Sequence, residues 1–218
     1  MFYVRSWRVA ILFVLFPFSA VSPERRKILK KAVRAINPAT YVLRVKDRVV
    51  ENFHVVQPGK LYRSAQLSPR ALEKYIKQHG IKTVVNLRGA HPGLSWWDQQ
   101  KAVCDRHGVR MFDIPMSAQT LTSKNHLLKL LEIYDSAPCP MLIHCRRGAD
   151  RTGEAAAIWC IEKMGHSNKK AGRQLSRYYQ HVQYPAKDFL IKIWGGREWL
   201  KRHYHPGAYH RFKQPVAA

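Results

Sequence analysis

A ten-residue segment, residues 144–153, reads His-Cys-Arg-Arg-Gly-Ala-Asp-Arg-Thr-Gly and constrains the fold more than any other part of the chain. It follows the short apolar run 140–143 and leads into the alanine-rich stretch 152–161. Such a run is typical of a buried strand, and such a stretch of a helix. A loop between the two turns its backbone N–H groups toward one centre at the positive end of the helix dipole. The segment therefore predicts an anion-binding loop in an α/β fold.

The side chains of this loop predict what the anion site does. Cys145 is the second residue of the segment, and Arg151 follows six positions later. A helix N-terminus and neighbouring cations lower the pKa of a thiol from about 8.5 to roughly 3.5–7.5, which favours the reactive thiolate. We expect Cys145 to be a nucleophile and the guanidinium of Arg151 to hold two oxygens of a tetrahedral oxyanion.

The remaining loop residues have supporting roles in this hypothesis. The Thr152 hydroxyl is placed to donate to the sulfur of Cys145, and the ring of His144 is placed to fix the loop. Gly148 allows a backbone conformation or a close approach that a side chain would block. The other residues expected to surround the anion are Arg146, Arg147, Ala149 and Asp150.

These residues resemble the signature loop of the cysteine-dependent protein phosphatases, written His-Cys-x5-Arg-Ser/Thr. The similarity is greatest to the small dual-specificity branch with its atypical bacterial and plant-fungal members. It extends over about residues 52–194 and includes the segments 59–68 and 80–88. The resemblance implies hydrolysis of phosphate monoesters through a cysteinyl-phosphate intermediate, with no metal and no cofactor.

A general acid for the leaving group has to come from outside the loop. Members of the resembled family carry an aspartate for this purpose well before the cysteine, and Asp113 lies 32 residues before Cys145. Asp113 is therefore the expected acid, and capping of a turn near Pro115 is the alternative. Asp150 is the second candidate, although we expect it to orient loop groups or a water molecule.

Periodicity along the chain predicts a mixed central sheet flanked by helices. The expected strands are residues 52–56, 61–64, 83–87, 110–114 and 140–143. The expected helices are residues 69–80 after the cap Ser68, 96–107, 124–136 after the cap Ser123, the stretch from 152, then 168–179 and 185–203. We expect four segments: a hydrophobic segment 1–22, a basic linker 23–50, a catalytic domain 51–204 and a flexible tail 205–218.

The N-terminal region predicts attachment to a membrane. The apolar run 9–21 is flanked by basic residues, and as a helix its 13 residues reach only about 20 Å. We expect a short uncleaved anchor; a cleaved signal peptide and a buried helix are the alternatives. The excess of basic residues after the run favours a bacterial inner membrane with the catalytic domain on the cytoplasmic side.

The charge of the chain predicts anionic partners. There are 38 Lys and Arg residues against 14 Asp and Glu residues, which gives a formal net charge of +24. Such a charge attracts phosphorylated substrates and the anionic surface of a membrane. Phosphorylated proteins are the first expected substrates, and inositol phosphates, inositol pyrophosphates or phosphoinositides are the alternative. An RNA 5′-triphosphatase and a non-catalytic phosphate-binding module remain further alternatives, and nucleic acid is not favoured.

Three other features have open interpretations. Arg88 could brace the anion loop, touch substrate, or lie in solvent. Trp96 and Trp97 could line the mouth of a pocket, although aromatic residues at the start of a helix are more often core. The histidines near the C-terminus, which include His181, have no regular spacing, so we expect no metal site.

Overall fold

The computed structural model describes residues 50–182 and 185–209. The chain divides into two compact units, Met1–Val45 and Lys46–Ala218, and the described residues belong to the second. The predicted anchor, most of the basic linker and most of the tail lie outside the described residues. Within the described ranges, no helix has both the length and the apolar character needed to cross a bilayer.

A five-stranded mixed sheet forms the centre of the domain, in the order β1-β2-β5-β3-β4. β1 pairs antiparallel with β2, whereas the other pairings are parallel. The strands are β1 (His54–Gln57), β2 (Leu61–Ser64), β3 (Thr83–Asn86), β4 (Arg110–Asp113) and β5 (Met141–His144). The predicted mixed sheet is therefore confirmed.

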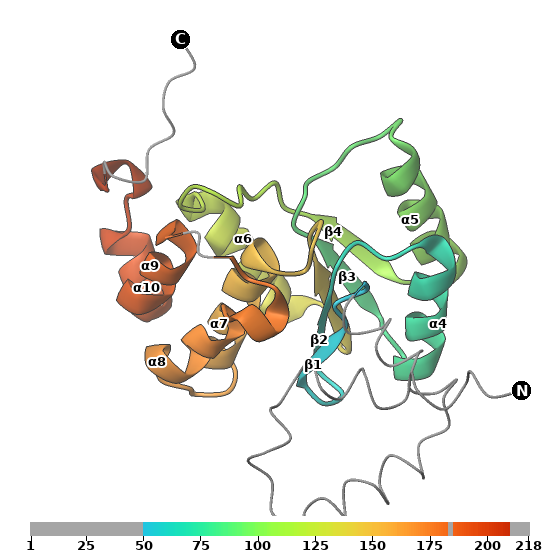
Figure 1. The fold of residues 1–218 in the computed structure, drawn as a ribbon. Coiled ribbons are helices and arrows are strands. Elements are labelled where there is room, and N and C mark those ends of the chain that lie inside the picture. Colours follow the sequence, from blue (N-terminus) through green and yellow to red (C-terminus); the bar gives the residue numbers. More distant parts are fainter. Residues whose placement is uncertain (1–49, 183–184, 210–218) are drawn as a thin grey trace, which may run out of the picture. The chain divides into compact units, whose positions relative to one another are not determined.

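Helices cover both faces of this sheet (Figure 1). α4 (Pro69–His79) and α5 (Ser95–Arg106) lie on one face, where their apolar side chains meet Val84 and Leu142. α6 (Lys124–Ser136) and α7 (Asp150–Glu162) cover the other face, where the core includes Val85 and Ile143. Successive residues of β3 and β5 thus enter opposite cores, because side chains alternate along a strand.

Capping residues begin and end several helices at the positions that the sequence predicted. The Ser68 side chain accepts a hydrogen bond from the backbone N–H of Ala71 at the start of α4, and Gly80 ends this helix with φ of 61°. Ser123 caps α6 in the same way through His126. β1 begins later than predicted, because Asn52 adopts a left-handed conformation with φ of 45° that is incompatible with a strand.

Two predicted helices are wrong in their extent. The helix expected over 168–179 is only α8 (Asn168–Ala171), followed by two 3-10 turns, Gly172–Gln174 and Arg177–Tyr179. The helix expected over 185–203 is two helices, α9 (Pro185–Ile193) and α10 (Gly196–His203). Gly196 has a φ of 84°, which interrupts the helix, and a Cβ on Gly195 would lie 2.6 Å from the ring of Trp199.

Candidate active site

The loop 145–149 connects the carboxyl end of β5 to the N-terminus of α7. At this edge of the sheet, the register pairs His144 with Asn86 and Asn86 with Asp113. The last residues of three parallel strands are therefore neighbours. Crevices beyond the carboxyl ends of strands are the usual ligand sites of open α/β sheets.

Gly148 and Arg63 determine the path of the loop. Gly148 has a φ of 69°, and a Cβ at this position would lie 2.5 Å from the carbonyl carbon of Ser64. The predicted need for glycine is thus confirmed, because β2 and the loop approach within backbone contact. The buried guanidinium of Arg63 donates through Nη2 to the carbonyls of Gly148 (2.7 Å) and Ala149 (3.3 Å). It fixes the loop from the side of β2.

Two further residues hold the loop by its backbone. The Asn52 amide, fully buried, donates to the carbonyls of Arg147 (2.9 Å) and Tyr179 (3.0 Å). The backbone N–H of Gln66 donates to the carbonyl of Arg146 at 3.2 Å. The carbonyls of Arg146, Arg147, Gly148 and Ala149 are therefore all engaged by residues around the loop.

The amide groups of the loop are left available for an anion. Among the described residues, the backbone N–H groups of Arg146, Arg147 and Gly148 donate to no protein oxygen. The side chains of Arg146 and Arg147 are exposed. Unengaged amides at the N-terminus of a helix, with fixed carbonyls facing the other way, form an anion site.

Cys145 lies at the base of this loop among guanidinium groups. The residue is only 2% exposed. Arg63 and Arg88 both interact electrostatically with Cys145. Burial raises the pKa of two other thiols, that of Cys104 to about 12 and that of Cys160 to about 11. These two thiols stay protonated and have no role in the chemistry.

His144 is neutral and faces α5. Burial, with a contribution from the positive charges of Arg88 and Arg151, lowers the pKa of His144 to about 3. Its Nε2 lies 3.0 Å from the Nε2 of the Gln100 amide, which is the donor to a neutral ring. Among the described residues, Nδ1 of His144 has no hydrogen-bond partner. Gln100 of α5 therefore holds the ring, and the role of His144 in fixing the loop stays a prediction.

Arg151 and Thr152 occupy the first turn of α7. Nη1 of Arg151 donates to the carbonyls of Leu87 and Met116, each at 3.3 Å, so segments after β3 and β4 position the guanidinium. The Thr152 hydroxyl is buried and has no partner among the described residues. The hydrogen bond predicted from Thr152 to Cys145 is therefore not formed in this structure.

Asp113 ends β4 and is held by two donors. Its Oδ1 accepts from the side-chain amide of Asn86 (2.6 Å) and from the indole of Trp97 (3.1 Å). β3 lies between β4 and β5, so Asp113 is two strand spacings, roughly 10 Å, from the strand that carries the loop. Trp97, which was considered as a pocket residue, therefore orients Asp113.

The side chain of Asp150 forms a hydrogen bond with a histidine outside the loop. Its Oδ1 lies 2.7 Å from Nδ1 of His181, and Nε2 of His181 lies 3.0 Å from Oδ2 of Asp188 on α9. Burial opposes a charge on His181, but the hydrogen bonds to Asp150 and Asp188 prevail and raise its pKa. Asp150 thus orients His181, and its expected role toward loop groups or a water molecule stays a prediction. In the described part of the chain, no cluster of three metal-ligating side chains occurs.

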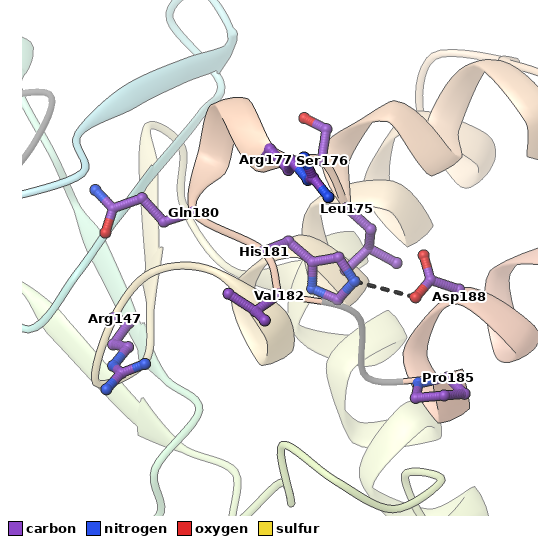
Figure 2. A pocket seen from close by; sticks show the side chains of 9 residues that line it. All are labelled: Arg147, Leu175, Ser176, Arg177, Gln180, His181, Val182, Pro185 and Asp188. Atoms are coloured by element: carbon purple, nitrogen blue, oxygen red, sulfur yellow. Dashed lines mark hydrogen bonds and ion pairs between the residues drawn. The ribbon is translucent and has the colours of Figure 1, made fainter.

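A cavity lies beside the loop, on the side of His181 (Figure 2). Figure 2 shows the ring of His181 turned toward Asp188, with Arg147 across the cavity. Arg147 is the one loop residue in its lining, which also includes Leu175, Ser176, Arg177, Gln180, His181, Val182, Pro185 and Asp188. Cys145 and Arg151 do not line this cavity, so it borders the loop without reaching the proposed nucleophile.

Sequence reasoning missed the residues that hold the loop: Asn52, Arg63, Gln66 and Gln100. One signal was available for Arg63, because it is the only charged residue of the four-residue strand Leu-Tyr-Arg-Ser. A fully buried arginine must find acceptors, and loop carbonyls supply them. No sequence pattern indicated the other three, whose partners are distant in the chain.

Comparison with known proteins is consistent with this site. The family model of the DSP-PTPase phosphatase fused to NAD+ kinase matches residues 44–190. The inositol diphosphatase SIW14 of Saccharomyces cerevisiae is 30% identical over 144 residues, which are 62% of this chain and 47% of the yeast protein. The chain thus spans about half the length of this curated relative.

Solved structures show the same fold. The core catalytic domain of the PP-IP phosphatase SIW14 from S. cerevisiae, in complex with citrate, superposes with a TM-score of 0.57 at 24% identity and covers 74% of this chain and 94% of that one. PTPMT1 superposes with a TM-score of 0.54 at 13% identity, covering 73% and 98%. The chain belongs to the DSP-PTPase phosphatases, a family of cysteine-dependent phosphatases of the atypical dual-specificity type.

Proposed function

We propose that the chain hydrolyses phosphate esters in two steps through Cys145. The thiolate attacks phosphorus in line, the bond to the leaving oxygen breaks, and a cysteinyl-phosphate forms. Water then attacks this intermediate, releasing inorganic phosphate and the thiolate. The observation that carries the proposal is the position of Cys145 beneath a loop of unengaged amides, among arginine side chains.

Each charged group has a defined role in the proposed reaction. Arg151 and the loop amides bind the non-bridging oxygens, which lowers the barrier mainly by positioning and electrostatic stabilisation. Asp113 protonates the leaving oxygen in the first step and accepts a proton from water in the second. Because Oδ1 of Asp113 is engaged by Asn86 and Trp97, Oδ2 is the oxygen assigned to proton transfer.

Two substrate classes fit this chemistry. Phosphorylated side chains of proteins are the class expected from the sequence. Inositol pyrophosphates are the second, because the yeast relative is an inositol diphosphatase and because Arg63 and Arg88 also interact electrostatically with the thiol. A single phosphate monoester carries a charge of only about −1.5 to −2 at neutral pH, so the additional cations favour the second class.

A substrate panel tests the proposed function. The purified chain is assayed with para-nitrophenyl phosphate, a phosphotyrosine peptide, a phosphoserine peptide, inositol hexakisphosphate and an inositol pyrophosphate. We expect release of phosphate that depends on Cys145, with the highest kcat/KM for the inositol pyrophosphate. The variant Cys145→Ser is the control for contaminating phosphatases. Turnover of no substrate, or equal turnover by this variant, would reject the proposed function.

A further inference from the structure

Arg88 is fixed beside the anion loop by three contacts. Its guanidinium lies over the ring of Trp96, 3.4 Å from the ring centroid. Its Nη1 donates to Oε1 of Gln66 at 3.2 Å, and its backbone N–H donates to Oδ1 of Asn86 at 3.0 Å. Stacking and a polar contact immobilise a side chain that would otherwise be disordered in solvent. Such an arrangement preorganises a charge.

This fixed charge lies close enough to the anion loop to interact with its charged groups. Arg88 interacts electrostatically with Arg151, Arg146 and Cys145. Partial burial, followed by the repulsion from Arg151 and Arg146, lowers the pKa of Arg88. In the described part of the chain, no carboxylate forms an ion pair with any of these three arginines. The thiolate proposed for Cys145 offsets only one of these three positive charges, so binding of a further anion among them is favourable.

One residue ties Arg88 to the loop and to the nucleophile. Gln66 accepts from Arg88, and its backbone N–H donates to the carbonyl of Arg146 at 3.2 Å. The side-chain amide of Gln66 also donates to Gln100, which in turn faces His144. Gln66 therefore joins Arg88, the loop backbone and the residue that precedes Cys145 in one set of hydrogen bonds.

We propose that Arg88, stacked on Trp96, forms with Arg146 a second phosphoryl-binding position next to the one at Cys145. It binds a phosphoryl group that is attached to the group under attack, as in a diphosphate. Arg151 and the loop amides hold the transferred phosphoryl group, so Arg88 and Arg146 are free to hold its neighbour. This inference rests on the proposed function, and it makes Arg88 a determinant of substrate class and not of the chemical step.

The test compares two substrates across matched variants. The kcat/KM values for an inositol pyrophosphate and for para-nitrophenyl phosphate are measured with the parent chain, Arg88→Gln and Arg88→Lys. Arg106→Gln removes the same charge from an exposed position on α5 and is the control. Thermal unfolding of every variant verifies the fold.

In Arg88→Gln, the ratio of the two kcat/KM values falls by at least about tenfold, the effect of losing one hydrogen-bonded charge. Arg88→Lys recovers part of the ratio, because it keeps the charge but not the planar stack. Arg106→Gln leaves the ratio unchanged. An unchanged ratio in Arg88→Gln, or an equal fall for both substrates, would overturn the second position. If the parent chain hydrolysed neither substrate, the proposed function itself would be refuted.

Discussion

Asp113 has one carboxylate oxygen engaged by Asn86 and Trp97, and this arrangement allows its two interpretations to be separated. In Asp113→Asn, the new side chain keeps an oxygen that can accept from both donors but has no proton to transfer at neutral pH. If Asp113 is the general acid, kcat on a phosphoserine peptide falls by about 100- to 10,000-fold. The loss on para-nitrophenyl phosphate is much smaller, because that leaving group needs little protonation.

Steady-state kinetics on the two substrates check this prediction for Asp113. Asp105→Asn, on the exposed side of α5, serves as the control. Equal effects on the phosphoserine peptide and the aryl phosphate would show that Asp113 only caps the strand end, which was the alternative interpretation.

Gly148 gives a second prediction at the scale of a single residue. In Gly148→Ala, a methyl group would lie 2.5 Å from the backbone of Ser64, so the loop must shift away from β2. We expect the free energy of unfolding to fall by about 1–3 kcal/mol and kcat to fall sharply. Denaturant titration and phosphatase assays measure the two effects.

The matched control is Gly59→Ala. Gly59 has nearly the same φ, 67°, but no atom lies within 4 Å of its added Cβ. This substitution adds backbone strain but no steric clash, so we expect the variant to keep its activity. A similar loss of activity in both variants would show that close approach to β2 is not what shapes the loop.

The predicted helix over 168–179 is wrong because contacts between elements override the local helix propensity of this segment. Residues 172–179 leave the helical path because Arg63 takes the carbonyl and the side chain of Gln174 and lies over the ring of Tyr179. This segment also packs closely on α7, because a Cβ on Gly153 would lie 2.6 Å from the side chain of Leu175. Strands and capped helices were predictable because their signals are local. The buried Arg63 contacts residues that are distant in the sequence, so its arrangement could not be predicted from local patterns.

The link between α7 and α9 gives a prediction on pH. Two contacts join these helices, the buried ion pair of Glu154 with Lys187 at 2.5 Å and the bridge from Asp150 through His181 to Asp188. The pKa of His181 is raised in the folded state. Its stabilisation is therefore fully present below the unfolded pKa of about 6.5 and is lost as the pH rises through the folded pKa.

His181→Gln removes this dependence. At about pH 6, we expect the free energy of unfolding of the parent chain to be higher than that of the variant by on the order of 1 kcal/mol. This difference in free energy is smaller at about pH 9. The partial exposure of Asp188 keeps the value modest. Denaturant titrations at the two pH values measure it. A difference that grew with pH would mean that His181 is neutral in the folded protein.

The charge of the whole molecule leads to a prediction about membranes. The net charge is +24, and six basic residues follow the apolar run: Arg25, Arg26, Lys27, Lys30, Lys31 and Arg34. We propose that this stretch binds an anionic membrane surface, with about 1 kcal/mol from each residue near the lipid. The full chain should cosediment more strongly with vesicles that contain anionic lipid than with neutral ones.

Replacing the six basic residues by glutamine checks this idea. We expect the preference for anionic vesicles to weaken in the variant, and to weaken in the parent chain as salt is added. An unchanged preference would place the lipid contact elsewhere on the molecule.

The most direct test of the whole account is a rapid-quench experiment on the thiol. The chain is mixed with excess para-nitrophenyl phosphate, stopped in acid within milliseconds and examined by intact and peptide mass spectrometry. The account predicts a burst of nitrophenol and a mass increase of one phosphoryl group that maps to Cys145. Turnover without any phosphorylated cysteine, or with the phosphoryl group on another side chain, would contradict it.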